Sequence, residues 1–253
     1  MSDPLSYSNP RVQRLRRLLG RRSARTEEGA FVVEGRSLVE QALAAGWRVE
    51  GQYVAPDTDP VRCDAPTYQL APGVLERVAS TESPQPVLAV VLQRPVNLPT
   101  SPTFVMVADR LSDPGNAGTI IRSAEAAGAD AVVLTPGSVD PYNPKVVRST
   151  AGSLFRVPVV TLGLDEVRGL GLRLLATSSH RGDAHTDTDL TGPVALVVGN
   201  EAHGVDDDAP VDDVDRLRGP EVVLRAPRAA MPRQHVAVRT AHARAVGLAA
   251  PAV

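Results

Sequence analysis

The chain has 253 residues, of which 43% are hydrophobic and 22% are charged, and its formal net charge is −2. This composition is ordinary for one or two globular domains; no apolar run approaches the roughly 18 residues of a membrane span, and the single cysteine, Cys63, excludes an internal disulfide and a cysteine metal cluster. Residues 1–10 are polar and lack the apolar stretch of a secretory signal, so we expect a cytoplasmic protein.

The first segment of the chain is strongly basic. Residues 7–26 predict a helix in which Val12, Leu15, Leu18 and Leu19 recur at helical spacing. No acidic residue lies between Asp3 and Glu27, whereas seven arginines do: Arg11, Arg14, Arg16, Arg17, Arg21, Arg22 and Arg25. Arginine suits phosphate because its planar fork can bind two oxygens at once. The balance reverses at residues 201–215, which are mainly acidic, so the small net charge conceals a dipolar surface.

A small α/β module follows the basic segment. It contains a strand at 29–35, a helix at 37–45 that ends before Gly46, a strand at 52–55, and two further units around 74–78 and 87–92. Three prolines then indicate a linker. We therefore expect four divisions, namely an arm at 1–28, a module at 29–92, a linker at 93–103 and a second domain at 104–253.

The second domain alternates strands with helices. Strands are predicted at 104–108, 131–134, 157–161, 172–177 and 194–198, and helices at 115–127 and 146–154. This alternation predicts an α/β fold with a mostly parallel sheet that is covered on both faces. Ligands of such sheets bind beyond the carboxyl ends of the strands, so the informative residues should follow the strands.

The first informative segment, residues 109–124, follows the strand at 104–108. It contains Asp-Pro-Gly-Asn, which is typical of a turn, and Asn116 can cap the helix that follows. Arg122 lies about two turns into that helix. On physical grounds alone, a tight strand-to-helix connection with a solvated arginine is the favoured explanation of this segment. The glycine spacing fits neither G-x-G-x-x-G nor the P-loop.

Two further segments carry candidate functional residues. In residues 196–204 a buried strand continues into Gly199, which lets a ligand approach the backbone, and Glu201, whose carboxylate needs a partner at a strand end. His203 has no second ligand at metal spacing, so we predict no metal site. In residues 140–155, Lys145 and Arg148 share one side of a predicted helix and could hold a phosphate. Ordinary turn residues and a solvated helix start are the simpler interpretations.

Together the three segments resemble the SpoU/TrmH branch of the SPOUT RNA methyltransferases. The family signature Asp-Pro-x-Asn-x-Gly-x-x-x-Arg-x-Ala is matched by Asp113, Pro114, Asn116, Gly118, Arg122 and Ala124. The signature Gly-x-Glu-x-x-Gly is matched by Gly199, Glu201 and Gly204, and residues 143–155 resemble the family's Asn-Pro-Lys-x-x-Arg stretch. Residues 29–92 look like the family's substrate-binding module, which is related to RNA-binding ribosomal proteins.

The resemblance implies a fold and an activity. The second domain would be a parallel-sheet SPOUT domain tied in a trefoil knot, behind a small α/β RNA-binding module. The protein would methylate ribose 2′-hydroxyls of rRNA or tRNA, with S-adenosylmethionine held around Thr177, Gly199, Ala226 and Gln234. It would be a homodimer in which the partner subunit completes each site.

The resemblance also implies residue roles. The family assigns activation of the ribose hydroxyl to the arginine matching Arg122. A guanidinium does not deprotonate in proteins, so we expect Arg122 to stabilise the developing alkoxide and to hold a phosphate, while Asn116 and Glu201 orient it and the ribose. Aromatic residues make up only 3%, so we expect arginines to contact the RNA backbone. The expected RNA-binding residues are Arg14, Arg17, Arg21, Arg22, Arg25, Lys145 and Arg148.

The third family motif diverges in residues 226–238. Arg228 and Ala230 replace the usual Met and Gly, and Arg233, Gln234 and His235 stand where Ser, Leu and Asn are usual. Positive charge near a sulfonium is unfavourable. Three explanations of this divergence compete: an enzyme with a diverged pocket, an RNA-binding protein without catalysis, or a sequence altered at this end by a frame error. We favour the enzyme because both upstream motifs are intact. A more distant alternative is an α/β enzyme that holds an anionic small molecule in its glycine loops.

Overall fold

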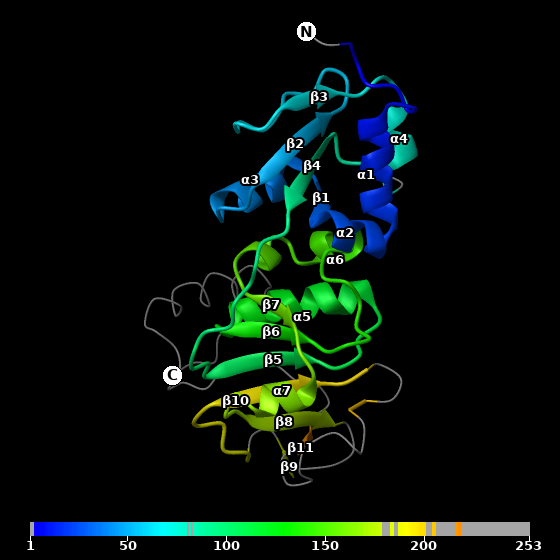
Figure 1. The fold of residues 1–253 in the computed structure, drawn as a ribbon. Coiled ribbons are helices and arrows are strands. Elements are labelled where there is room, and N and C mark those ends of the chain that lie inside the picture. The colour runs from blue at the N-terminus through cyan, green and yellow to red at the C-terminus, as the bar shows by residue number, and fades with distance from the viewer. Residues whose placement is uncertain are drawn as a thin grey trace, which may run out of the picture. The chain divides into compact units, whose positions relative to one another are not determined.

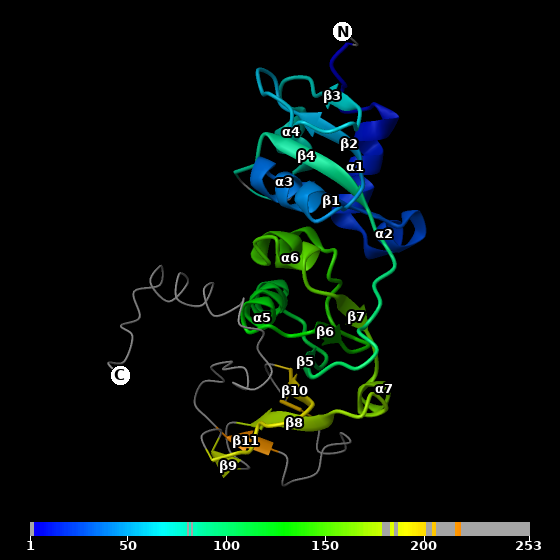
Figure 2. The same ribbon diagram turned by 90° about the vertical axis from the view of Figure 1, so that its left-hand side faces the viewer.

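The computed structural model describes residues 3–79, 81, 83–178, 183–184, 187–200, 204–205 and 216–218. The chain divides into two compact units (Figures 1 and 2). The first unit contains Met1–Val96, Asp113–Thr119 and Val139–Arg156, and the second contains Asn97–Ser112, Ile120–Ser138 and Val157–Val253. The first change of unit, between Val96 and Asn97, falls within the linker predicted at residues 93–103, but two later segments pack with the beginning of the chain.

The first unit is built on a four-stranded sheet in the order β1-β4-β2-β3. Strand β4 is antiparallel to both β1 and β2, and β3 is parallel to β2. The strands are β1 (Ala30–Glu34), β2 (Val49–Val54), β3 (Thr67–Gln69) and β4 (Val87–Leu92). The helices are α1 (Pro10–Gly20), α2 (Arg22–Glu28), α3 (Arg36–Ala44), α4 (Val74–Val78) and α6 (Pro144–Ser149).

The basic segment forms two helices instead of the single helix predicted for 7–26. Asn9 caps α1 by accepting a hydrogen bond from the Arg11 backbone N–H, and Arg21 is extended, so α2 begins anew at Arg22. The apolar face of α1 is buried in the same core as Val32 and Leu88 of the sheet. The apolar residues of the segment 1–28 therefore belong to the core of the module.

The two faces of this sheet are covered by different helices. Helices α1 and α4 lie side by side over one face (Figure 1). Helix α3 covers the other face (Figure 2), where Phe31 of β1 contacts the rings of Trp47 and Tyr142. Helix α6 packs against β1 as well, and the Trp47 indole donates a hydrogen bond to the Phe155 carbonyl at 3.0 Å. Residues 139–156 thus complete the core of the first unit.

The second unit contains a seven-stranded sheet in the order β7-β6-β5-β10-β8-β11-β9, and every described pairing in it is parallel. The prediction of a parallel α/β sheet is confirmed. The strands are β5 (Phe104–Ala108), β6 (Ala131–Leu134), β7 (Val159–Thr161), β8 (Arg173–Ser178), β9 (Asp183–Ala184), β10 (Val194–Val198) and β11 (Arg216–Arg218). Helix α7 (Leu164–Arg168) packs on the sheet through Val167, and α5 (Pro114–Ala126) begins in the first unit and continues in the second.

One predicted helix is shorter in the structure, and one predicted feature lies outside the described residues. The helix predicted for 146–154 is shorter: α6 ends at Ser149, Ala151 and Gly152 have left-handed φ angles of 49° and 95°, and a 3-10 turn follows at Ser153–Phe155. Residues 226–238, which the resemblance places in the trefoil knot, lie outside the described part of the chain. Within that part, no helix is long and apolar enough to cross a membrane.

Candidate functional site

The carboxyl ends of β5 and β10 lie next to each other in the second unit, because the two strands are parallel neighbours. The Asp109 backbone N–H donates to the Val198 carbonyl at 2.8 Å. The Asn200 side-chain amide donates to the Arg110 carbonyl at 2.9 Å. The loops that follow these strands begin the first and second signature segments. The expectation that informative residues gather beyond the strand ends is therefore confirmed for these two loops.

The loop after β5 is held in a strained conformation. Arg110 is left-handed, with φ of 49°, although it is not a glycine. Its backbone N–H donates to the Thr135 hydroxyl at 2.8 Å, and that hydroxyl donates to the buried Asp109 carboxylate at 2.8 Å. The Leu111 N–H donates to the Ser138 hydroxyl at 3.2 Å. Such strain, of about 1–3 kcal/mol, is found where surrounding contacts fix a loop for function.

The loop after β10 folds back on itself at Gly199. Asn200 and Gly204 exchange two backbone hydrogen bonds, of 3.1 and 2.8 Å. A Cβ atom on Gly199 would overlap the Gly204 carbonyl carbon and the Val205 nitrogen. Gly199 was expected to let a ligand approach the backbone, but in the described structure the chain itself, at Gly204 and Val205, makes the close approach. Thr177, on the neighbouring strand β8, is half-buried next to this loop's strand.

The first turn of α5 is capped by Asp113 and not by Asn116. The Asn116 backbone N–H donates to the Asp113 carboxylate at 2.8 Å, and Pro114 is the first helical residue. Proline suits this position because its missing N–H would have no partner within the helix. Asn116 is therefore inside the first turn, with an exposed side chain. The capping role predicted for Asn116 is wrong, since a carboxylate three residues earlier accepts the hydrogen bond.

Helices α5 and α6 approach closely within the first unit. A Cβ on Gly118 would lie 2.5 Å from the Ser149 Cβ, so a larger side chain cannot occupy this position without moving α6. The Ser149 hydroxyl donates to the Pro114 carbonyl at 3.1 Å, and the Lys145 ammonium lies 4.0 Å from the Asp113 carboxylate. The first and third sequence segments are thus packed together here, and Gly118 of the first signature is explained by that packing.

The remaining predicted catalytic and cofactor-binding residues fall in two groups. Arg122 is exposed on the part of α5 that belongs to the second unit. Arg122 lies six positions after Asn116 on α5, and the two residues belong to different units. Glu201, Ala226 and Gln234 lie outside the described residues.

The expected RNA-binding residues are not equally available. Arg25 is buried, with its side chain 4% exposed, and its guanidinium pairs with Asp140 at 2.7 Å. Its assignment to RNA is wrong, because this contact holds residues 139–156 against the module and leaves no face for a phosphate. Arg148 likewise pairs with the buried Glu34 at 2.8 Å, whereas Lys145, Arg21 and Arg22 are exposed.

Arg14 and Arg17 are also paired with carboxylates. Arg14 contacts both Glu28 and Glu50, and Arg17 contacts Glu28 at 3.3 Å. The hydrogen bonds from Arg14 hold the pKa of Glu50 below its ordinary value, and the same bonds raise the pKa of Arg14. Two carboxylates therefore offset much of the positive charge on this side of α1.

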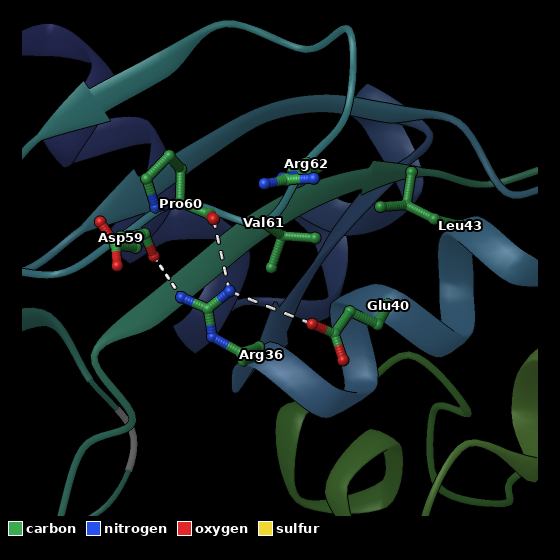
Figure 3. A pocket seen from close by; sticks show the side chains of 7 residues that line it. All are labelled: Arg36, Glu40, Leu43, Asp59, Pro60, Val61 and Arg62. Carbon is green, nitrogen blue, oxygen red and sulfur yellow. Dashed lines mark hydrogen bonds and ion pairs between the residues drawn. The ribbon is translucent and has the colours of Figure 1, made fainter.

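A pocket of about 700 Å³ lies between α3 and residues 59–62, away from the signature segments (Figure 3). Arg36 points from α3 toward the backbone carbonyls of Asp59 and Pro60, donates to both, and lies 4.0 Å from Glu40. The pocket is lined by Arg36, Glu40, Leu43, Asp59, Pro60, Val61 and Arg62. Because Arg36 is already bound to the chain, we assign no ligand to this pocket. Among the described residues, no group of three potential metal ligands occurs.

The polar residues that follow β6 were not predicted from the sequence. Thr135 and Ser138 are buried and fix the backbone of the loop after β5. They belong to no signature quoted above. The rule that functional residues follow parallel strands could have found them, because β6 is the neighbour of β5 and its end lies at the same edge of the sheet.

Comparisons with known proteins agree with this architecture. Residues 103–217 match the sequence model of the SpoU rRNA Methylase family, and residues 9–89 match that of the MRM3-like substrate binding domain. The chain is 36% identical over 209 residues to the 23S rRNA (guanosine(2553)-2′-O)-methyltransferase RlmP of Bacillus subtilis, covering 79% of this chain and 83% of that protein. It is 33% identical over 227 residues to the 23S rRNA (uridine(2479)-2′-O)-methyltransferase of Streptomyces viridochromogenes, covering 79% and 78%.

Solved structures give the same result. The SpoU methyltransferase AviRb from Streptomyces viridochromogenes, in complex with the cofactor AdoMet, superposes with a TM-score of 0.74 at 29% identity and covers 94% of this chain and 97% of that one. An AdoMet-bound rRNA methyltransferase from Sinorhizobium meliloti superposes with a TM-score of 0.76 at 26% identity, covering 98% and 99%. With the parallel sheet, the two joined loops and the signature residues already in place, these matches show that the chain belongs to the SpoU rRNA methylase family.

Proposed function

We propose that this protein transfers a methyl group from S-adenosylmethionine to a ribose 2′-hydroxyl of ribosomal RNA. The observation that carries the proposal is the pair of signature loops joined beyond β5 and β10 by the Asn200–Arg110 hydrogen bond. The relatives described above are named rRNA 2′-O-methyltransferases, and two of the similar structures hold AdoMet. The module at residues 9–89 is the type that binds the substrate in this family.

The described residues fit this cofactor. Thr177 and Gly199 lie at the carboxyl ends of neighbouring parallel strands, where α/β sheets bind nucleotide-like ligands. The loop at Gly199 is folded tightly on itself and excludes a side chain there, so that only backbone is presented at this strand end. Ala226 and Gln234 would complete the set. When bound, the cofactor supplies a methyl group that is activated by a positively charged sulfur.

The protein must position the ribose and handle the charge that develops on its hydroxyl. Methyl transfer would form a bond between the 2′-oxygen and the methyl carbon as the carbon–sulfur bond breaks, and the hydroxyl proton would leave to a phosphate or to water. Arg122 stays protonated, so its role is to stabilise the developing alkoxide and hold an adjacent phosphate. Asn116 and Glu201 are proposed to orient Arg122 and the ribose, as the family signatures imply.

The protein is further proposed to act as a homodimer in the cytoplasm. The resemblance to the family supports a dimer whose partner subunit completes each site, and an rRNA substrate suits the cytoplasmic location. Light scattering on the purified protein would test the dimer. One chain has a mass of 26.7 kDa, so a particle of twice that mass supports the proposal and a particle of 26.7 kDa contradicts it.

Calorimetric titration with S-adenosylmethionine tests the activity first. We expect micromolar binding, followed by methylation of unmodified 23S rRNA. Arg122→Ala should lower kcat by about a hundredfold or more, because a preorganised charge at the reacting oxygen is lost, with little change in cofactor affinity. Arg168→Ala, which removes an exposed arginine from α7, is the matched control and should retain activity.

A second candidate function is supported by the divergence of residues 226–238. Arg228 and Arg233 would place positive charge near the cofactor's sulfonium, which favours an RNA-binding protein that has lost methyl transfer. Absence of cofactor binding at millimolar concentration, by a folded protein with RNA present, would contradict the enzyme and support this alternative.

A further inference from the structure

Three arginines cover two tyrosine rings at one end of the first unit. The Arg11 guanidinium lies 4.9 Å from the centre of the Tyr68 ring. The guanidinium groups of Arg16 and Arg77 lie 4.8 and 3.6 Å from the centre of the Tyr7 ring. These are distances at which a cation is attracted to the face of an aromatic ring. We call these five residues, Tyr7, Arg11, Arg16, Tyr68 and Arg77, the arginine–tyrosine surface.

The surface is built from segments that the fold holds together. The Leu5 N–H donates to the Gln69 carbonyl at 2.7 Å, and the Ala71 N–H donates to the Leu5 carbonyl at 3.0 Å, so the segment carrying Tyr7 runs beside the end of β3, which carries Tyr68. Both tyrosines are half-buried against the core shared by α1 and α4. These two helices lie side by side and supply the arginines (Figure 1). The rings are therefore fixed platforms for exposed guanidinium groups.

The positive charge of this surface is not offset by carboxylates. Elsewhere on α1 and α2, Arg14, Arg17 and Arg25 pair with Glu28, Glu50 or Asp140. In the part of the chain that the structure describes, Arg11, Arg16 and Arg77 have no ion pair. Arg16 donates one hydrogen bond to the Gln13 side chain at 2.9 Å, and a guanidinium stacked by its face keeps its remaining N–H groups available for hydrogen bonding to phosphate. Three guanidinium groups without an ion pair therefore lie together at the arginine–tyrosine surface.

We propose that the arginine–tyrosine surface binds the sugar–phosphate backbone of the RNA substrate, an inference that rests on the proposed function. Ordering three guanidinium groups on rings reduces the entropy lost when each one binds a phosphate. The ring faces are occupied by arginine, so this surface reads backbone position and not base identity. It would orient the substrate on the module, and the residues that choose the nucleotide lie elsewhere.

A charge-matched comparison tests the surface. The variant Arg11→Ala/Arg16→Ala/Arg77→Ala would be compared with Arg36→Ala/Arg62→Ala/Arg168→Ala, which removes the same charge from exposed positions outside the surface. Binding of a fluorescein-labelled RNA hairpin would be followed by anisotropy at several salt concentrations. We expect the first variant to bind at least about tenfold more weakly at low salt, and its slope of log affinity against log salt to fall by about two. The control should change much less.

Equal losses in the two triple variants would overturn the proposal, because binding would then follow net charge alone. Full displacement of the hairpin from the protein by polyglutamate would also overturn the proposal, since the surface would then accept any polyanion, including an acidic protein. Thermal melts of both variants check folding. S-adenosylmethionine titration separates this proposal from the proposed function. If cofactor binding and rRNA methylation were normal while the two triple variants had equal hairpin affinity, the role of the arginine–tyrosine surface would be refuted and the proposed function would stand.

The ring platform has its own test. Tyr7→Phe keeps the ring and should bind the hairpin as the unmodified protein does. Tyr7→Leu keeps the apolar contact with the core but removes the ring face that orders Arg16 and Arg77. We expect weaker hairpin binding for the leucine variant, with rescue by phenylalanine. Equal affinity of the two variants would show that the arginines do not need the ring and would contradict this part of the proposal.

Discussion

At the scale of single residues, Gly199 shows how a signature glycine can be required by its surroundings. Its φ is not left-handed, so its backbone conformation does not demand glycine. A Cβ would instead overlap backbone atoms of Gly204 and Val205, which cannot rotate away as a side-chain tip can. Gly199→Ala should therefore destabilise the fold by about 1–3 kcal/mol and weaken S-adenosylmethionine binding, because the loop after β10 must open.

Thermal melts and cofactor titration would measure both effects of Gly199→Ala. Gly20→Ala is the control, since a Cβ at the end of α1 meets no atom within 4 Å. It should leave stability unchanged or raise it slightly. Equal melting temperatures for the two variants would contradict the steric explanation of Gly199.

Glu50 gives a pH-dependent prediction. The hydrogen bonds from Arg14 lower its pKa in the folded protein below the ordinary value of 4.5, so its ionised form stabilises the fold above that pH. This contribution is lost as the pH falls through the folded pKa. Glu50→Gln should therefore cost less than about 1 kcal/mol at neutral pH, since the pair is partly exposed, and the difference should vanish in acid. Urea unfolding at several pH values measures it, and a difference that grows in acid would contradict it.

At the scale of elements, one buried ion pair fastens residues 139–156 to the N-terminal module. Arg25 and Asp140 are both buried, at 3% and 8% exposure, and the Arg25 guanidinium also donates to the Leu18 carbonyl at 2.7 Å. Asp140→Ala should destabilise the protein by about 3–5 kcal/mol, because it leaves a buried guanidinium without its carboxylate. Arg25→Met/Asp140→Leu should recover much of this loss. Denaturant unfolding would compare them, and a harmless Asp140→Ala would contradict the role.

At the scale of the whole molecule, cofactor binding and folding are linked. A ligand that binds only the folded chain stabilises it by about 2.7 kcal/mol at a hundred times its Kd. We therefore expect S-adenosylmethionine to raise the melting temperature of the protein, with a much smaller rise for Gly199→Ala. An unchanged melting temperature at a concentration that saturates the protein in calorimetry would contradict binding to the folded state.

The division into two units also belongs to this scale. Asp113–Thr119 of the first signature packs in the same unit as the N-terminal module, whereas Arg122 belongs to the other unit. The sequence shows one continuous motif and predicts one helix. The division arises because Gly118 allows α5 to approach Ser149 of α6, and α6 is itself held by Arg148 to Glu34 of β1. The Arg148–Glu34 contact joins residues more than a hundred positions apart, so no local pattern reveals it.

The sequence by itself determined the parallel α/β architecture, the core face of α1 and the family, because apolar periodicity and signature spacing are local properties of the chain. It also placed Gly199 and Arg122 after the correct strands. Only the tertiary structure decided which arginines are available: Arg25 is buried by Asp140, Arg14 is bound by Glu28 and Glu50, and Arg11, Arg16 and Arg77 lie on tyrosine rings. The physical reason is that every arginine contributes the same charge to the sequence pattern. The carboxylates and rings that bind each one come from distant segments that meet only in the fold.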